Sequence, residues 1–493
     1  MKKKKERKKN SIIKPSRRNF LKAAGASGVG LALPLYSPRA AMGAQVYSGT
    51  HYILVNAQGG WDPTFFCDPK TSTGSEYMRK DGDDRFGYGG VEGKNDDAPT
   101  IGDKQLFADI SMTKISQGVD AYLAEGRTAT DFLDKAHGYT NPAVLNGLVP
   151  HTEFFNAHRS RLRIINGIDT STNNHRSGSR IMWSGLIDEG FPSLGAYLAA
   201  SLSTTNGVDL PMAYLASGGF QYTAGVIPIT RVSSRDVLAR LKQPNVFTSG
   251  STTSLYHDES VSEMIRQRSE ARLNRLKSKQ LIPHKETAIS SLFLAQTANS
   301  GISDIVIPDE SPQISQLHSS LGGLRSMMRQ TDVILAAFQA GISIAANLSI
   351  GNFDTHDTHI NRQVQRQIEL FTGLDFLMKR IDATGLDVQV IVASDFGRTP
   401  AFNVGRGKDH WPITSMMMLG SKVKGGVTVG ATDDGLLQVG VDPATLKAKP
   451  DGGVSITPAH VHAAIRRLSG TDTGPLATQY PLKDAANIDI LKA

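Results

Sequence analysis

One stretch in the second half of the chain restricts its fold more than any other. Residues 342–350 and 387–393 are short, apolar and rich in β-branched side chains, as buried strands are. Residues 361–383, between them, carry apolar side chains at helical spacing. The order strand, helix, strand predicts a βαβ unit, whose two strands lie parallel in one sheet. The chain is therefore expected to be an α/β protein built on a mostly parallel sheet.

Acidic and histidine side chains follow both of these predicted strands. The carboxyl ends of parallel strands meet at one edge of a sheet, where such proteins place their sites. Carboxylate and imidazole groups are ligands for zinc and manganese, so we expect a site for one or two of these ions. The alternative is an Asp/His-rich loop whose side chains cap helices. The candidate ligands are Asp354, His356, His359, Asp395 and His410.

A third strand end carries the same kind of residue. Residues 51–56 read as the first strand after the N-terminal region, and Gly59, Gly60 and Asp62 follow it. Aspartate is also a common turn residue, so one such position would mean little. Three strand-end aspartates favour a converging carboxylate site, and Asp62 joins the candidate metal ligands.

A polar loop follows the predicted strand at residues 161–168. Its arginines are candidates for binding an oxyanion such as phosphate or sulfate, and Arg398 is another. A hydroxyl beside a metal ion can become a nucleophile. The alternative is a Ser/Asn-rich turn that caps a helix. The candidates in this loop are His175, Arg176, Ser177, Ser179 and Arg180.

The N-terminal region has its own composition. Residues 1–44 hold twelve of the 54 Lys and Arg residues and one acidic residue. The run 16–22 (SRRNFLK), followed by a short apolar stretch, resembles a twin-arginine export signal. This resemblance implies a signal peptide over residues 1–44, the twin-arginine translocase as a partner, and a periplasmic or extracellular location.

The composition of residues 45–493 argues against some classes of protein. These residues carry 42 basic and 45 acidic side chains and no basic patch interleaved with aromatic residues, so nucleic-acid binding is not expected. No later segment has 18 uninterrupted apolar residues, so the mature chain is expected to be soluble. The single cysteine, Cys67, excludes intramolecular disulfides. We expect it to be buried and inert; the alternative is a nucleophile.

Two parts of the mature region, residues 45–493, read as insertions. Residues 68–140 form a polar loop, and residues 218–320 form a peripheral helical insertion with a charged helix at 259–280 and a second helix at 287–298. Further strands are predicted at 210–217 and 413–419, with a hairpin edge at 425–430. A helix is predicted at 458–468, where His460 and His462 are expected at the surface because i and i+2 point apart.

Several of these motifs together resemble the DUF1501 family of exported bacterial proteins. They are the leader, Gly59-Gly60-Trp61-Asp62, the segment 175–185 ending in Trp-Ser-Gly, and Phe353-Asp354-Thr355-His356. The most specific are Ser394-Asp395-Phe396-Gly397-Arg398-Thr399-Pro400 and Asp409-His410-Trp411. The resemblance spans nearly the whole mature chain, and the family is in turn similar to the alkaline phosphatase and sulfatase superfamily.

The resemblance implies a three-layer α/β sandwich with a central mostly parallel sheet, a peripheral helical insertion and metals at the strand ends. Matched by order, Asp62 and Asp395 would share one ion. The second ion would be bound by Asp354, by His356 or His359, and by His410. The nucleophile would be Ser177 or Ser179, and Arg176, Arg180 or Arg398 would bind the oxyanion.

The chain departs from the superfamily at two points. Phe396 follows Asp395 where a histidine is usual, which removes one ligand, and the sulfatase pattern Cys/Ser-x-Pro-x-Arg is absent. The leading hypothesis is an exported metal-dependent hydrolase of phosphate or sulfate esters. The alternative is a non-catalytic envelope or periplasmic protein, for binding or assembly, that retains the fold.

Overall fold

The computed structural model describes most of the mature region. The described residues are 46–68, 104–107, 110–113, 147–149, 151–231, 234–249, 252–280, 301–357, 359–401, 403, 407–483, 485 and 488–491. The expected signal peptide, most of the expected loop at 68–140 and the expected helix at 287–298 lie outside them.

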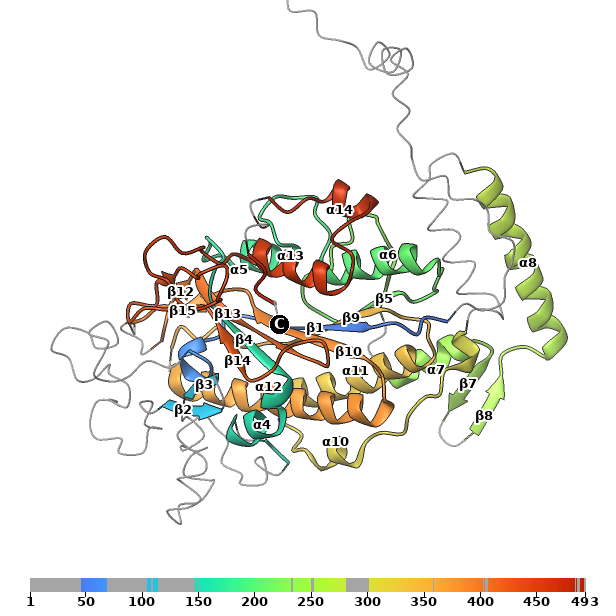
Figure 1. The fold of residues 1–493 in the computed structure, drawn as a ribbon. Helices are drawn as coiled ribbons and strands as arrows, with labels where there is room; N and C mark the ends of the chain where they lie inside the picture. Colours follow the sequence, from blue (N-terminus) through green and yellow to red (C-terminus); the bar gives the residue numbers. More distant parts are fainter. Residues whose placement is uncertain are drawn as a thin grey trace, which may run out of the picture. The chain divides into compact units, whose positions relative to one another are not determined.

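The centre of the structure is a sheet of eight strands in the order β14-β4-β13-β10-β1-β9-β5-β6 (Figure 1). Neighbouring strands are parallel except at β13, which is antiparallel to both β10 and β4. The expectation of an α/β protein with a mostly parallel sheet is therefore confirmed. The strands are β1 His51–Ala57, β4 Leu162–Asp169, β5 Tyr214–Ala216, β6 Ile229–Thr230, β9 Ala345–Ile350, β10 Val388–Ser394, β13 Ile413–Leu419 and β14 Val427–Val429.

Helices cover both faces of this sheet (Figure 1). Successive residues of a strand point to opposite faces. In β1, Ile53 and Val55 pack into one hydrophobic core with α4, α11 and α12, while Leu54 packs into the other with α5, α6 and α13. Because both faces are buried, the central strands are apolar throughout instead of alternating. The helices are α4 His151–His158, α5 His175–Ser184, α6 Leu194–Asn206, α11 Gly322–Gln339, α12 His359–Thr384 and α13 Pro458–Leu468.

The predicted βαβ unit is present, with one strand inserted in it. Strand β9, helix α12 and strand β10 follow one another along the chain as expected. In the sheet, however, β1 lies between β9 and β10 and is parallel to both. The βαβ crossover therefore spans one intervening strand.

Three parts of the fold differ from the sequence-based expectations. Strand β14, expected in a hairpin edge, is an edge strand that pairs in parallel with β4. Strand β6 extends the central sheet although its residues were assigned to the helical insertion. The antiparallel strands β2 Lys104–Phe107 and β3 Ile110–Thr113 lie within the expected polar loop.

Apart from β6, the described part of the expected helical insertion at residues 218–320 lies outside the central sheet. It contains α7 Arg235–Lys242, the antiparallel strands β7 Val246–Ser249 and β8 Thr252–Leu255, the largely exposed helix α8 Glu259–Ser278 and α10 Pro312–Gln316. Among the described residues no helix is both long and apolar enough to cross a membrane.

The histidines of α13 correct another expectation. Both His460 and His462 are buried, not at the surface. The ring of His460 caps its own helix through Thr457, and Nε2 of His462 lies 2.9 Å from the carbonyl oxygen of Met182 in α5. Their roles are structural because α13 packs along its buried face against α5. Cys67 is buried, as expected.

Candidate metal centre

The carboxyl ends of three parallel strands bring the predicted site residues to one edge of the sheet. The last residue of β1, Ala57, is in register with Ile350 of β9 and Ser394 of β10. Asp62, Asp354 and Asp395 follow these strand ends. Strand β4 ends beside the start of β13, where Asp169 pairs with Ile413, and this brings in the segments that carry His175 and His410. The convergence expected from the sequence is thus produced by strand register.

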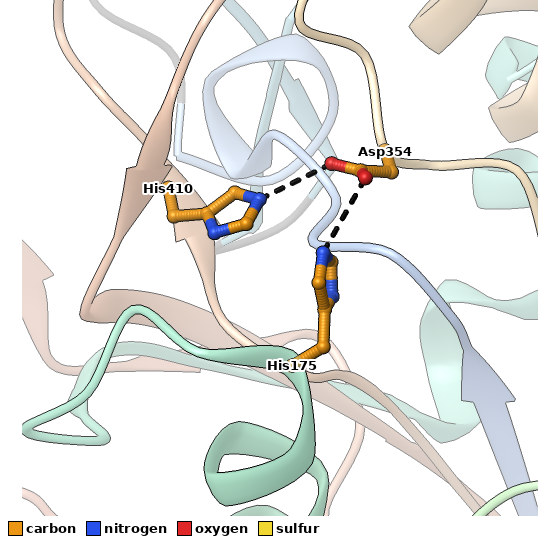
Figure 2. A group of neighbouring side chains, drawn as sticks. All are labelled: His175, Asp354 and His410. Carbon is orange, nitrogen blue, oxygen red and sulfur yellow. Dashed lines mark hydrogen bonds and ion pairs between the residues drawn. The ribbon is translucent and has the colours of Figure 1, made fainter.

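Three of these side chains form a compact group around one carboxylate (Figure 2). Nε2 of His410 lies 3.2 Å from Oδ1 of Asp354, and Nε2 of His175 lies 3.4 Å from Oδ2 of the same carboxylate. Each residue offers one ligand atom, and these atoms all lie within 4.8 Å of one another. They come from the first turn of α5, the loop after β9 and the short strand β12 His410–Trp411.

The other ring nitrogen of each histidine is held by an oxygen acceptor. Nδ1 of His175 lies 3.1 Å from Oδ2 of Asp395, and Nδ1 of His410 lies 2.7 Å from the carbonyl oxygen of Asn173. A carbonyl oxygen accepts only, so Nδ1 of His410 donates to it, and Nε2 is the ring nitrogen that faces Asp354. Metal-binding histidines are oriented in this way by outer acceptors.

His356 adds a third imidazole to the group. Its Nδ1 lies 2.9 Å from Oδ1 of Asp409, while its Nε2 lies 3.1 Å from Oδ1 of Asp354 and 3.0 Å from Nε2 of His410. Three imidazole Nε2 atoms therefore face one carboxylate. This donor set fits a divalent transition-metal ion, since imidazole and carboxylate are ligands of zinc.

The pKa values of the group reflect its crowded charges. Burial alone would raise the pKa of Asp354, but Arg398 and His410 lower it to about 2. The hydrogen bond to Asp395 raises the pKa of His175. Burial lowers the pKa of His410. At neutral pH, Asp354 is therefore a carboxylate and the ring of His410 is neutral.

Arg398 positions Asp354 and is not directed at an incoming ester. Its side chain is fully buried, and Nη2 donates to Oδ1 of Asp354 at 2.7 Å. Nη2 also donates to the carbonyl oxygens of Gly59 and Phe353, while Nε donates to that of Gly60 and Nη1 to that of Lys408. Since these groups occupy the guanidinium, the expected role of Arg398 as an oxyanion clamp has no support from the structure.

Asp62 and His359 belong to a separate, fully buried cluster. Oδ2 of Asp62 accepts from Nζ of Lys408 at 2.8 Å and lies 2.9 Å from Nε2 of His359, and all three side chains have no exposed surface. Burial alone would raise the pKa of Asp62, but Lys408 and His359 hold it well below its usual range. The expected grouping of Asp62 with Asp395 around one ion differs from this arrangement, because Asp62 is neutralised by a lysine.

Among the described residues, neither expected nucleophile forms a hydrogen bond with the three-residue group. Ser179 donates to Oδ1 of Asp395 at 2.6 Å, and Asp395 also accepts from the backbone N–H of Gly59. Residues i and i+4 share a helix face, so His175 and Ser179 meet the same carboxylate; Ser177, at i+2, lies on a different face. In α5 the side chain of Asn174 caps the helix, as the alternative interpretation of this loop held.

The two arginines of this loop have different surroundings. Arg180 is ion-paired with Glu189 and donates to the carbonyl oxygen of Ile187. Arg176 is exposed, next to His175, and its guanidinium forms no ion pair within the part of the chain that the structure describes. Arg176 is thus the better placed of the two to meet an anion.

The ring of Phe396 packs against two histidines of the candidate metal centre. This buried ring lies 4.8 Å from the ring of His175 and 4.4 Å from that of His410, measured between centroids. A Cβ atom at Gly60 would lie only 2.5 Å from the same ring, so a glycine is required there. The residue that follows Asp395 in the chain is therefore an apolar ring that packs against two imidazoles.

The sequence identified most members of the centre but not their grouping. Asp354, His356 and His410 lie together as expected, whereas Asp395 orients His175 and does not face Asp354. His175 was expected to act in catalysis, and its position beside Asp354 was missed. The contact of Lys408 with Asp62 was also missed, because the only sequence signal of Lys408 is its place before Asp409 and His410.

With this geometry established, comparison with known proteins gives a family. Residues 53–480 match the family described as "Protein of unknown function (DUF1501)", and the chain belongs to it. Residues 14–34 match the twin-arginine translocation pathway signal sequence. The protein is therefore exported by the twin-arginine pathway and meets its translocase on the way.

Comparisons with curated proteins and with solved structures give no further relative that bears on function. No curated protein matches the chain. Two solved structures are similar at low level: Ps i-CgsB, with a TM-score of 0.34, and Ps i-CgsB in complex with k-i-k-neocarrahexaose, with a TM-score of 0.33. Each is 8% identical and covers 91% of this chain and 76% of its own. Scores this low carry no argument about function.

Proposed function

We propose that the protein is an exported metal-dependent hydrolase of phosphate or sulfate esters, on a sandwich of the kind found in alkaline phosphatases and sulfatases. The observation that carries this proposal is the convergence of three imidazole Nε2 atoms on Asp354 at the carboxyl ends of the strands. The side chain of Asp354 is 44% exposed, so the group is accessible to a substrate from solvent.

His175, Asp354 and His410 would hold the ion, with His356 as a further nitrogen within reach. A bound divalent ion supplies Lewis-acid chemistry: it polarises an ester oxygen and favours ionisation of an attacking hydroxyl or water. The chain supplies orientation. Asp395 and the carbonyl oxygen of Asn173 fix the two imidazoles, and Arg398 fixes the carboxylate.

The anionic part of the substrate would meet Arg176. This side chain follows His175 directly, is exposed and offers the planar donor pattern that matches phosphate and sulfate oxygens. Ser179 is engaged by Asp395, and Ser177 lies on a different face of α5, so the attacking group in this proposal is a water molecule and not a serine. The chain then positions the substrate and the imidazoles but forms no covalent intermediate.

The test is hydrolysis of aryl phosphate and aryl sulfate esters by the purified exported protein. It should be assayed after removal of metal with a chelator and after addition of zinc or manganese. We expect activity only with the ion, and a loss of at least about 100-fold in kcat/KM in Asp354→Asn and His410→Ala, as for loss of a group acting in the transition state.

The matched control is His257→Ala, which removes an exposed histidine outside the site and should leave activity unchanged. Equal rates in all variants would show that the hydrolysis arises elsewhere. A metal-loaded protein that cleaves neither class of ester would favour the second function, a non-catalytic envelope or periplasmic protein for binding or assembly. One observation favours this second function: groups of the protein itself already occupy the hydrogen-bonding positions of Asp62 and Arg398.

A further inference from the structure

We propose that this edge of the sheet holds a single divalent ion, at His175, Asp354 and His410, and that Lys408 supplies the positive charge at Asp62 that a second ion would otherwise supply. The inference rests on the metal ion of the proposed function but not on ester hydrolysis. In this inference Lys408 is a fixed internal cation, and the site binds one ion instead of two.

The first step is the crowding of imidazole Nε2 atoms around Asp354. Its one firm donor is Arg398, at 2.7 Å from Oδ1. The other neighbours are Nε2 atoms, and the Nδ1 atoms of these rings face Asp395, Asp409 and the carbonyl oxygen of Asn173. With the ring protons on Nδ1, three nitrogen lone pairs and a carboxylate face one another, which is unfavourable unless a cation lies among them.

The second step is the opposite situation at Asp62. Oδ1 accepts from the backbone N–H and the hydroxyl of Thr64, at 3.0 and 2.6 Å. Oδ2 has Nζ of Lys408 at 2.8 Å and Nε2 of His359 at 2.9 Å. A buried carboxylate requires a cation, and here the chain provides one. Neither oxygen has a position left for a metal ion.

The third step concerns Asp395, the remaining carboxylate at this edge. Oδ1 accepts from Ser179 at 2.6 Å, and Oδ2 accepts from Gly59 at 3.0 Å and from Nδ1 of His175 at 3.1 Å. The residue after it is Phe396, whose apolar ring packs against the rings of His175 and His410. Asp395 is therefore an outer partner of His175. Of the three carboxylates, only Asp354 has an oxygen, Oδ2, whose described polar neighbour is an imidazole Nε2 alone.

The experiment measures zinc binding to the purified, exported, metal-free protein by equilibrium dialysis and elemental analysis, with no substrate present. We expect one tightly bound equivalent. His410→Ala should lose it, and His257→Ala should retain it. Two tightly bound equivalents in the unchanged protein would overturn the proposal, and so would none.

A double variant isolates the role of Asp62. Asp62→Asn with Lys408→Met removes both charges of the buried pair together, which avoids the penalty of leaving one unpaired. We expect it still to bind one zinc ion, because Asp62 is not a ligand. Loss of bound zinc from a variant that remains folded by circular dichroism would overturn the proposal.

A second measurement needs no substitution and covers the case in which the double variant does not fold. Manganese-loaded wild-type protein is examined by electron paramagnetic resonance. An isolated ion gives an uncoupled spectrum, whereas two ions about 3.5–4 Å apart are magnetically coupled. A coupled spectrum would overturn the single-ion assignment. If one ion binds and no ester is cleaved, the proposed function fails while this inference stands.

Discussion

At the scale of single residues, neighbours decide what each acidic side chain does. Asp62, Asp354 and Asp395 all follow strand ends, yet the first is neutralised by Lys408, the second faces three imidazoles and the third orients His175. Sequence alone made them equivalent, because each is an aspartate in a turn after a buried strand. Their different roles depend on partners that are distant along the chain.

His462 is a residue whose burial predicts a pH dependence of stability. Burial lowers its pKa from 6.5 to about 3. The unfolded chain therefore binds a proton on this ring at a higher pH than the folded protein does. Its neutral, buried form stabilises the fold fully above pH 6.5, and that contribution is lost as the pH falls toward 3. At pH 5 the loss is about 2 kcal/mol.

The measurement is denaturant unfolding of wild type and His462→Gln at pH 7.5 and pH 5. The glutamine retains an N–H donor for the carbonyl oxygen of Met182. We expect the loss of stability between the two pH values to be about 2 kcal/mol smaller in the variant. The other buried histidines titrate in both proteins and cancel. Equal losses in the two proteins would contradict the assignment.

At the scale of elements, the turn after β1 has the strictest requirement. Gly59 has a φ of +118°, and a Cβ atom there would lie 2.5 Å from the backbone nitrogen of Asp354. Its N–H also donates to Asp395. The close approach of this turn to the loop after β9 is what sets Asp354 and Asp395 at their positions.

Gly59→Ala should therefore destabilise the protein and displace Asp354. The strained φ and the contact with backbone atoms together should cost at least about 2 kcal/mol. Zinc affinity should fall as well, because Asp354 is a proposed ligand. The control is Gly322→Ala at the start of α11, where a Cβ atom meets nothing within 4 Å and alanine favours the helix. Thermal unfolding and zinc titration check both effects, and unchanged values in Gly59→Ala would contradict them.

At the scale of the whole molecule, the leader and the mature region have separate tasks. The match to a twin-arginine signal at residues 14–34 assigns export to the leader, and the DUF1501 match covers 53–480. Arg17→Lys with Arg18→Lys should leave the precursor in the cytoplasm while the mature region is unchanged. Cell fractionation with immunoblotting checks this, and an undiminished exported fraction would show that export does not depend on the arginine pair.

Local patterns in the sequence were sufficient for the elements and for the edge at which they place the site. The spacing of apolar residues indicated β9, α12 and β10, and the strand-end positions of Asp62, Asp354 and Asp395 indicated convergence. Both follow from short-range chemistry: β-branched apolar runs form buried strands, and parallel strands end at a common edge. The signal sequence was equally local.

Only the tertiary structure decided the strand order and the different roles of the side chains in the candidate metal centre. The position of β1 between β9 and β10, the parallel pairing of β14 and the burial of His462 depend on which faces meet in space. In the same way, His175 faces Asp354 because α5 begins beside Asp395, and Asp62 is paired within the protein because Lys408 reaches it. The charge and hydrogen-bond balance of a side chain is a property of its surroundings, and those are assembled from distant parts of the chain.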